Sequence, residues 1–383
     1  MSEPIIYKGR GYPELYDDLM DFMNYVFGFN GNSSDFKKLL PKLYAKDCDP
    51  CYANYVVTED GKLKAAIGAF DSVLNVNGEQ LVCRGIGNVA VHPYSRSKGY
   101  MIDCMNMALS DMIRDGVDFS ILGGRRQRYG YFGFDAIGAE YNVSINRTNM
   151  RHVFRNVPFT ELEFVNIGAD DTELLDKIFA LHNTRPLHTE RSREKFYDIA
   201  RSWCKPVRAI LKEGKFIGYF CGDLCELTLC DMSDFNDVIR NYINEYGDVT
   251  LDIAAWDKPL IEAAMAVCED TEIGTCDMFN ILNYKRFVGA FLRFKTSFEV
   301  IADGTLTLFI HGYAGDCKLC LNVCDNVATV TELDPAAECE LELTHKEAEQ
   351  LLFGLYSPYT SRLSPELRSW FPLPLYVENA DHV

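Results

Sequence analysis

The sequence lacks the apolar segments of membrane and secreted proteins. No apolar run reaches the roughly 18 residues that a membrane-spanning helix needs. The opening segment MSEPIIYKGRGYPELYDDLM has no basic region followed by an apolar stretch, which a secretory signal requires. We therefore expect a cytoplasmic protein without a membrane span. Its 383 residues are enough for two or three domains.

Basic residues are scarce relative to acidic ones. Lysine and arginine number 38 against 56 aspartates and glutamates, which gives a formal net charge of −18. Nucleic-acid binding relies on a basic face that neutralises phosphates, so this composition argues against a nucleic-acid partner. A negative field attracts cationic small molecules. Acidity that serves solubility alone is the simpler interpretation and stays open.

Complete metal and nucleotide motifs are also missing. Cys48–Cys51 and Cys317–Cys320 have the Cys-x-x-Cys spacing of zinc ligands, but neither has a second pair at zinc-finger distance. We expect no metal site, and we expect the fourteen cysteines to be reduced and buried. The P-loop pattern Gly-x-x-x-x-Gly-Lys-Ser/Thr is absent. The dinucleotide pattern Gly-x-Gly-x-x-Gly does not occur at the strand–helix junction described next.

A short basic loop is present where a strand meets a helix. The stretch VAVHPYSRSKGYM runs from Val89 to Met101 and places Arg96, Lys98 and Gly99 just before an amphipathic segment. Backbone N–H groups at a helix start, together with the helix dipole, form a ready site for phosphate. Arg96 and Lys98 can neutralise the phosphate charge, and Gly99 permits close approach. A plain turn with solvated charges is the alternative.

The first part of the chain predicts a mixed sheet with helices on its faces. Apolar residues recur at helical spacing over 14–27 and 98–115. Two tight turns between three apolar runs over 51–91 are typical of an antiparallel meander. Short strands are expected at 118–122 and 139–147. A meander that feeds a strand–loop–helix–strand unit indicates an α/β domain.

A weaker copy of this pattern follows, and then a third part. VRAILKEGKFIGYFCG (207–222) echoes YVVTEDGKLKAAIGAF (55–70), with an acidic–Gly–Lys turn between two strands. A chance match of two hairpins is the alternative. From TSFEVIADGTLTLFIHG (296–312) onward, alternating strands and one late helix predict a small α+β unit. We assign three domains, 1–150, 151–286 and 287–383.

A second motif, RYGYFGFDAIG from Arg128 to Gly138, carries a family resemblance. Together with Arg96-Ser97-Lys98-Gly99-Tyr100-Met101 it resembles the GNAT family of acetyl-CoA-dependent N-acetyltransferases, although the family prefers a small residue at Met101. The match is closer to the Eis-like branch, through two sets of residues: Val89, Val91, Pro93, Arg96 and Gly99, and then Tyr129, Gly130, Phe132, Gly133 and Phe134. The resemblance implies an α/β fold with mixed sheets. It consists of a catalytic GNAT domain, a degenerate GNAT-like domain and a C-terminal domain like a sterol carrier protein.

The resemblance also implies the reaction and its partners. It is transfer of an acetyl group from acetyl-CoA to a primary amine by direct attack. The acceptor is an aminoglycoside-like compound, a polyamine or a lysine side chain, with 27–36 as a substrate loop. One coenzyme per chain is expected, because 255–259 in the second copy contains no glycine. The branch forms homo-oligomers, a hexamer among them. The residues expected at the coenzyme are Val89, Ala90, Val91, Arg96, Ser97, Lys98, Gly99, Tyr100 and Met101.

Two catalytic groups are expected from the same resemblance. Tyr129 opens the Tyr-Gly-x-Phe-Gly-Phe element and is the general acid, whereas a packed core tyrosine is the alternative. The branch uses its C-terminal carboxylate as general base, which here belongs to Val383. Asp381 and His382 are neighbouring alternatives for the base, and a frayed terminus is another.

Two further points stay open. Three arginines precede the catalytic element and either hold coenzyme phosphates or form a solvated, ion-paired face: Arg125, Arg126 and Arg128. A rival function from another class is a non-catalytic protein that binds an apolar ligand through the C-terminal domain.

Overall fold

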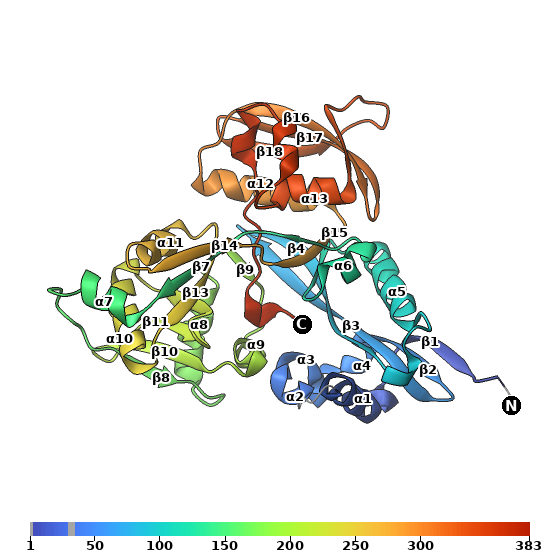
Figure 1. Ribbon diagram of the computed structural model, residues 1–383, viewed down its shortest axis with the longest axis horizontal. Helices are drawn as coiled ribbons and strands as arrows, with labels where there is room; N and C mark the ends of the chain where they lie inside the picture. Colours follow the sequence, from blue (N-terminus) through green and yellow to red (C-terminus); the bar gives the residue numbers. More distant parts are fainter. Residues whose placement is uncertain (1–2, 30–34) are drawn as a thin grey trace.

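The computed structural model describes residues 3–29 and 35–383. Residues 30–34, part of the expected substrate loop, lie outside the described residues. Figure 1 shows two lobes side by side and a third lobe above them, with the C-terminal segment returning between the first two. The mixed sheets with helices on their faces confirm the expected α/β class. Within the described ranges, no helix is long and apolar enough to cross a membrane.

The sheet of the first lobe contains the predicted meander. β2, β3 and β4 are consecutive antiparallel neighbours, and tight turns at Asp60-Gly61 and Asn77-Gly78 connect them. The strands in spatial order are β1 (Ile6–Arg10), β2 (Asn54–Glu59), β3 (Lys62–Val76), β4 (Glu79–Val91), β5 (Phe119–Leu122), β15 (Asp277–Ile281) and β6 (Asp135–Ile137), and β9 (Leu187–Thr189) pairs with the end of β3.

Helices cover both faces of this sheet, as predicted from the two amphipathic segments. Successive side chains of a strand point to opposite faces. Val57 and Ile67 accordingly pack with α5 (Tyr100–Arg114), and Val56 and Ala66 pack in the cluster that contains α1 (Tyr16–Gly28). The short helices of this lobe are α2 (Phe36–Leu39), α3 (Pro41–Tyr44), α4 (Pro50–Ala53) and α6 (Arg126–Tyr129).

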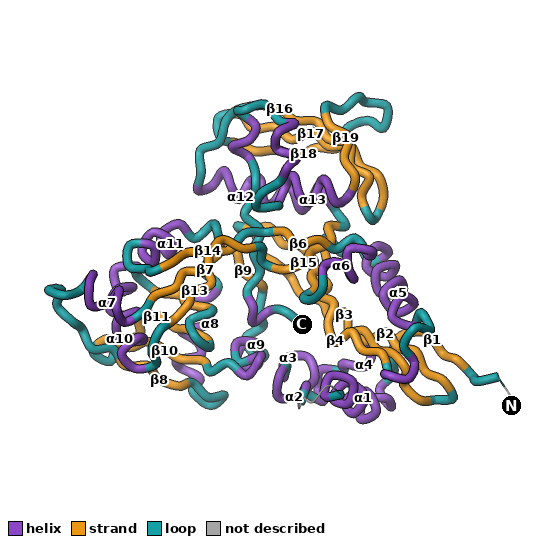
Figure 2. The backbone as a smooth tube through the Cα atoms, viewed as in Figure 1, coloured by secondary structure: helices purple, strands orange, loops and turns teal. Residues whose placement is uncertain are grey.

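The second lobe repeats the strand-and-helix plan in two smaller sheets (Figure 2). One sheet consists of β12 (Glu226–Leu229), β11 (Lys215–Cys221), β10 (Val207–Lys212) and β8 (Glu163–Asn166), and the other of β13 (Val249–Ala254), β7 (Glu140–Ile145) and β14 (Asp270–Gly274). Its helices are α7 (Arg147–Val153), α8 (Thr172–His182), α9 (Phe196–Ala200), α10 (Phe235–Glu245) and α11 (Lys258–Met265).

The first two lobes exchange strands. β7, which the range 1–150 places in the first domain, pairs on both sides with β13 and β14 of the second lobe. In return β15, from the range 151–286, lies between β5 and β6 of the first sheet. The domain ranges stay predictions, and the pairing adds that neither lobe is built from one continuous stretch of chain.

The third lobe contains a helix that the sequence analysis missed. α12 (Tyr284–Phe298) spans the predicted boundary at 286–287, so the strand expected from residue 296 is wrong up to residue 303. Phe287, Phe291 and Phe294 are buried at helical spacing, and their aromatic β-propensity hid the helix. The other elements are β18 (Val327–Glu332), β17 (Gly315–Cys324), β16 (Gly304–Gly312), β19 (Leu341–Thr344) and α13 (His345–Phe353).

Candidate active site

A wedge opens in the first sheet between β4 and β5. These two strands are parallel but pair only at Cys83 and Phe119, and beyond that point they diverge. On its other side β4 carries a bulge, because Asn88 and Val89 stand opposite the single residue Ile67 of β3. A bulge leaves its extra residue outside the ladder and redirects the strand. Backbone groups of β4 are thereby freed at the mouth of the wedge.

The bulge is held by a buried polar chain. Asn88 has φ 41°, in the left-handed region that asparagine tolerates better than most residues. The Tyr44 hydroxyl donates to Asn88 Oδ1 at 2.7 Å, and Asn88 Nδ2 donates to Asn54 Oδ1 at 2.8 Å. These bonds satisfy the side chain away from water, so the bulge is rigid.

A cavity of about 450 Å³ occupies the wedge. Its floor comes from β4 and from the end of β5, and its rim includes Tyr129, His382 and Val383. The structure therefore brings together Val89, Tyr129 and Val383, which lie far apart in the sequence. The remaining residues expected at the coenzyme do not line this cavity: Ala90, Val91, Arg96, Ser97, Lys98, Gly99, Tyr100 and Met101.

Two glycines of β4 let the chain terminus reach this cavity. A Cβ atom on Gly87 would lie 2.9 Å from the carboxyl carbon of Val383, and one on Gly85 would lie 2.8 Å from Val383 Cγ2. Contacts this short do not occur between real atoms, so only glycine fits at both positions. The terminus packs directly on the strand that forms the wedge.

Tyr129 and Tyr131 occupy different environments. Tyr129 ends α6 and is 6% exposed, whereas Tyr131 is 78% exposed. Burial raises the pKa of Tyr129, and the neighbouring Arg128 charge opposes this shift. The phenol is therefore protonated at neutral pH and stands at the cavity as a potential proton donor.

The basic loop lies at the start of α5. Gly99 is the N-cap with φ 81°, and a Cβ there would meet no heavy atom within 4 Å, so the space beside it is open. Arg96, Ser97 and Lys98 are exposed. Lys98 Nζ pairs with Glu59 Oε1 at 2.7 Å, which satisfies one of its donors. The loop presents the N–H groups of a helix start to solvent.

Residues 11–137 match the family model described as an acetyltransferase (GNAT) domain. The chain carries a GNAT acetyltransferase domain. The protein is accordingly an acyltransferase that works with acetyl-CoA, and a domain of this family implies an amine-type acceptor. No curated protein matches the sequence.

Solved structures resemble the whole chain, not only its GNAT domain. A conserved protein of unknown function from Enterococcus faecalis is 17% identical, with a TM-score of 0.68 over 100% of both chains. A GCN5-related N-acetyltransferase from Anabaena variabilis is 14% identical, with a TM-score of 0.67 over 98% of each chain. Eis1 from Mycobacterium abscessus is 10% identical, with a TM-score of 0.62 over 95% of each chain. At these identities the likeness shows the fold.

Buried cations anchor the C-terminal segment beside the GNAT domain. Arg191 donates to Asp381 through Nε and Nη2, both at 2.9 Å, and to Glu226 through Nη1 and Nη2, at 3.0 and 2.9 Å. Arg185 pairs with Glu378. Burial by itself would raise the pKa of Asp381, but the Arg191 charge outweighs it and leaves that pKa below its ordinary value. Asp381 is thus committed to an ion pair and is a poor candidate for the base.

Lys42 holds the last turn of the tail. Its Nζ donates to the carbonyl oxygens of Ala380 and His382, at 2.5 and 2.7 Å. Burial lowers the pKa of Lys42 to about 7, although the charge of Asp381 opposes that shift. No local pattern could identify this residue, because its partners lie more than three hundred positions away.

His382, the other alternative for the base, is also partnered. Its Nδ1 lies 3.0 Å from Asp277 Oδ2, and its Nε2 lies 3.2 Å from the carbonyl oxygen of Val377. Asp277 begins β15, so the strand exchange supplies this contact to the GNAT domain. Both ring nitrogens face an acceptor oxygen, and these two contacts fix the orientation of the ring at the cavity rim.

The three arginines before the catalytic element have separate roles. Arg126 pairs with the buried Asp135, which also accepts from Gln350 of α13 at 2.7 Å. Arg128 lines the wedge cavity. Arg125 is exposed. Of the two alternatives, phosphate ligand or ion pair, the structure decides only for Arg126, which forms an ion pair. Through Asp135, this pair connects the GNAT domain to the third lobe.

In the second lobe, a side-chain carboxylate occupies the helix start where a phosphate would bind. The order β2, β3, β4, α5 of the first lobe is matched by β10, β11, β12, α10 in the second, so the counterpart of the basic loop precedes α10 and not, as expected, α11. There Asp231 accepts from the backbone N–H of Ser233 at 2.8 Å. A carboxylate of the chain thus takes the place that a phosphate would need. Among the described residues, no group of three or more His, Cys, Asp or Glu could hold a metal ion.

Proposed function

We propose that this protein is an N-acetyltransferase of the Eis-like type, which transfers the acetyl group of acetyl-CoA directly to a primary amine. The observation that carries this proposal is the single cavity at the β4 bulge, lined by both Tyr129 and Val383. The coenzyme would lay its phosphates on the loop 96–101 and its thioester in the wedge. The resemblance alone supports a cytoplasmic homo-oligomer and a sterol-carrier-like third lobe.

The proposed reaction needs a general base, stabilisation of the oxyanion and a general acid. The terminal carboxylate of Val383 removes a proton from the ammonium, because only a neutral amine attacks the thioester. Backbone N–H groups freed by the bulge stabilise the oxyanion as the new C–N bond forms. The C–S bond then breaks, and the Tyr129 hydroxyl protonates the departing thiolate. The nitrogen gives up its second proton, which restores the Tyr129 phenol through water, and the proton held by Val383 is released to solvent. Lys42 positions the carboxylate by fixing the carbonyls just before it.

The acceptor side of the cavity is mainly apolar. Phe36, Leu39 and Leu40 line it from the first lobe, and Trp203 comes from the second. Trp203 has φ 62°, a strained conformation for a bulky residue, and such strain is typical of functional positions. Of the three expected acceptor classes, the alkyl stems of a polyamine or a lysine fit this wall better than a hydroxylated aminoglycoside. An amine-panel assay that reads free thiol tests this choice.

Coenzyme binding is tested by Gly99→Glu. We expect this change to abolish acetyl-CoA binding, because the new carboxylate repels phosphate at the helix start. Calorimetry on the unchanged protein should saturate at one coenzyme per chain, since the Asp231 carboxylate occupies the corresponding turn of the second lobe. Gly116→Glu is the matched control, because Gly116 also has a positive φ and open space at the other end of α5. Equal loss in both variants would refute the loop as the phosphate site.

The base is tested by lengthening the chain. Adding Gly-Ser after Val383 moves the carboxylate away, and we expect kcat to fall about 10²-fold or more, as for loss of a general base. Val383→Ala keeps the carboxylate and should retain most of the activity. If the lengthened enzyme is as active as the original, water or a side chain is the base. Titration of the protein with acetyl-CoA and with a fatty acid tests the rival function as an apolar-ligand binder.

A further inference from the structure

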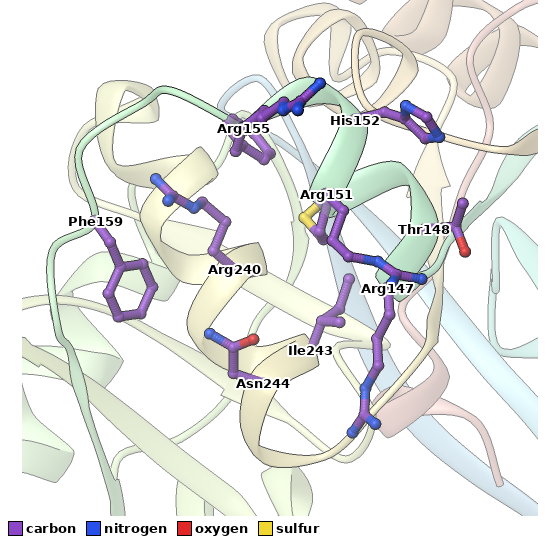
Figure 3. Close-up of a pocket in the computed structure, with 11 residues that line it drawn as sticks. Arg147, Thr148, Arg151, His152, Arg155, Phe159, Arg240, Ile243 and Asn244 are labelled. Atoms are coloured by element: carbon purple, nitrogen blue, oxygen red, sulfur yellow. The ribbon is translucent and has the colours of Figure 1, made fainter.

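A second cavity, of about 1010 Å³, lies in the second lobe, away from the wedge. Figure 3 shows it between α7 and α10, with arginine side chains approaching from both helices. Four of its eleven lining residues are arginines, a fifth is His152, and none is acidic. The four arginines are Arg147, Arg151, Arg155 and Arg240.

The basic lining of this cavity is opposite in charge to the chain as a whole. Acidic residues outnumber basic ones by 56 to 38 in the whole chain. In another cavity, of about 640 Å³ between the first two lobes, cations face carboxylates, since Arg84 pairs there with Asp71 and Asp115. In the cavity of the second lobe, no acidic lining residue neutralises the arginines. Its positive charge is a local exception to a negative field.

Three cations on one wall of this cavity repel one another. Arg147 and Arg151 are four residues apart in α7, which places them on one side of that helix, and Arg155 lies in the turn that follows it. Over residues 3–29 and 35–383, no carboxylate lies within ion-pair distance of these three guanidinium groups. The nearby acidic side chains accept hydrogen bonds from a backbone N–H and from a side-chain amide instead. Asp248 accepts from the Arg147 N–H at 3.1 Å, and Glu269 accepts from Asn149 at 2.6 Å.

Arg240 is fixed in place on the opposite wall. It donates to the carbonyl oxygens of Pro158 and Val157 at 2.6 and 3.2 Å. Its guanidinium carbon lies 4.9 Å from the Phe154 ring centre and 5.0 Å from that of Phe159. Phe159 remains 44% exposed at the cavity. The wall therefore offers a preorganised cation beside an accessible aromatic face.

We propose that this cavity binds a polyphosphate, a compact ligand that carries several phosphate groups. Arginine forks match phosphate oxygens, and a ligand between α7 and α10 would relieve the repulsion among three unpaired cations. The concave shape and the net charge of −18 disfavour long polyanions such as nucleic acid. The proposal is independent of the acetyl-transfer site, because its residues belong to other elements.

Calorimetric titration of the full chain with inorganic tripolyphosphate and with ATP tests this site. We expect saturable binding that weakens as salt rises. Arg147→Gln combined with Arg151→Gln should reduce affinity by about tenfold for each lost arginine, or roughly 100-fold together. The matched control is Arg193→Gln combined with Arg201→Gln, since these arginines of the same lobe are paired with Asp176 and Asp198.

The outcomes separate the possible ligands. Equal affinity for both probes assigns the site to inorganic polyphosphate. A preference for ATP that Phe159→Ala removes assigns it to a nucleotide. The proposal is overturned if neither probe binds, or if a single-stranded oligonucleotide or polyglutamate displaces them at lower concentration. It is also overturned if Gly99→Glu abolishes binding while the double arginine variant retains it, because the anion then occupies the coenzyme loop.

Discussion

The Tyr129→Phe enzyme should turn over about 10²–10⁴ times more slowly than the unchanged enzyme, the usual span for loss of a general acid. The ring and its packing remain, and only the hydroxyl proton is lost. An unperturbed phenol has a pKa of about 10, and burial raises that of Tyr129, so the group is protonated at neutral pH. The leaving thiolate is comparably basic, and a positioned donor helps most as charge develops on sulfur. Steady-state kinetics at saturating acetyl-CoA measure this effect.

Tyr131→Phe is the control for this prediction. Its hydroxyl belongs to a ring that is 78% exposed, so the rate should change little. Coenzyme affinity and melting temperature should stay nearly constant in both variants. If the two variants behave alike, or if Tyr129→Phe loses stability rather than turnover, then Tyr129 is a packing residue and the proposed acid is wrong.

Arg191→Met should lower the free energy of unfolding by about 3–5 kcal/mol, the range for breaking a buried ion pair from one side. Arg191 is fully buried and neutralises both Glu226 and Asp381. Methionine keeps much of the volume but removes the main counter-charge of two buried carboxylates, and only Lys42 remains as a cation near Asp381. Turnover should fall as well, because Asp381 no longer fixes the segment that ends at Val383. Urea unfolding followed by circular dichroism measures the stability.

The pH dependence has a definite sign. Without Arg191 the pKa of the buried carboxylates rises above the unfolded value, since burial penalises the charged form. A carboxyl group with a raised folded pKa destabilises the fold above that pKa and does no harm below the unfolded one. The deficit should therefore be largest at pH 7 and shrink toward pH 4. Arg193→Met, which breaks a pair exposed to solvent, should cost less than about 1 kcal/mol. A similar cost for both variants would refute the anchoring role of Arg191.

Local patterns in the sequence predicted local structure well. The meander over β2–β4 and the helix α5 follow from turn residues and apolar spacing, which are properties of neighbouring residues. The motif around Tyr129 predicted a site there, and the structure places this residue at the wedge cavity. No such pattern signalled the β4 bulge, which depends on the contacts of Asn88 with Tyr44 and Asn54.

Long-range pairing could not be predicted from the same patterns. β7 and β15 are short strands of mixed polar and apolar residues, and nothing in their own residues indicates that they exchange lobes. Lys42 looks like a surface lysine until the tail folds over it. The arginines of 147–155 are not singled out by the sequence analysis, because only α10 packed opposite them makes a cavity. These features depend on tertiary structure, which a single sequence does not display.

The position of β15 has a consequence for synthesis of the protein. β5 and β6 leave the ribosome by Ile137, yet the strand that joins them ends only at Ile281, after the whole second lobe has been made. A nascent chain that stops before this residue has a split sheet with two unpaired strand edges, and exposed edges invite aggregation. The first lobe therefore cannot mature as an independent early unit, and the chain depends on protection of those edges until most of it has been made.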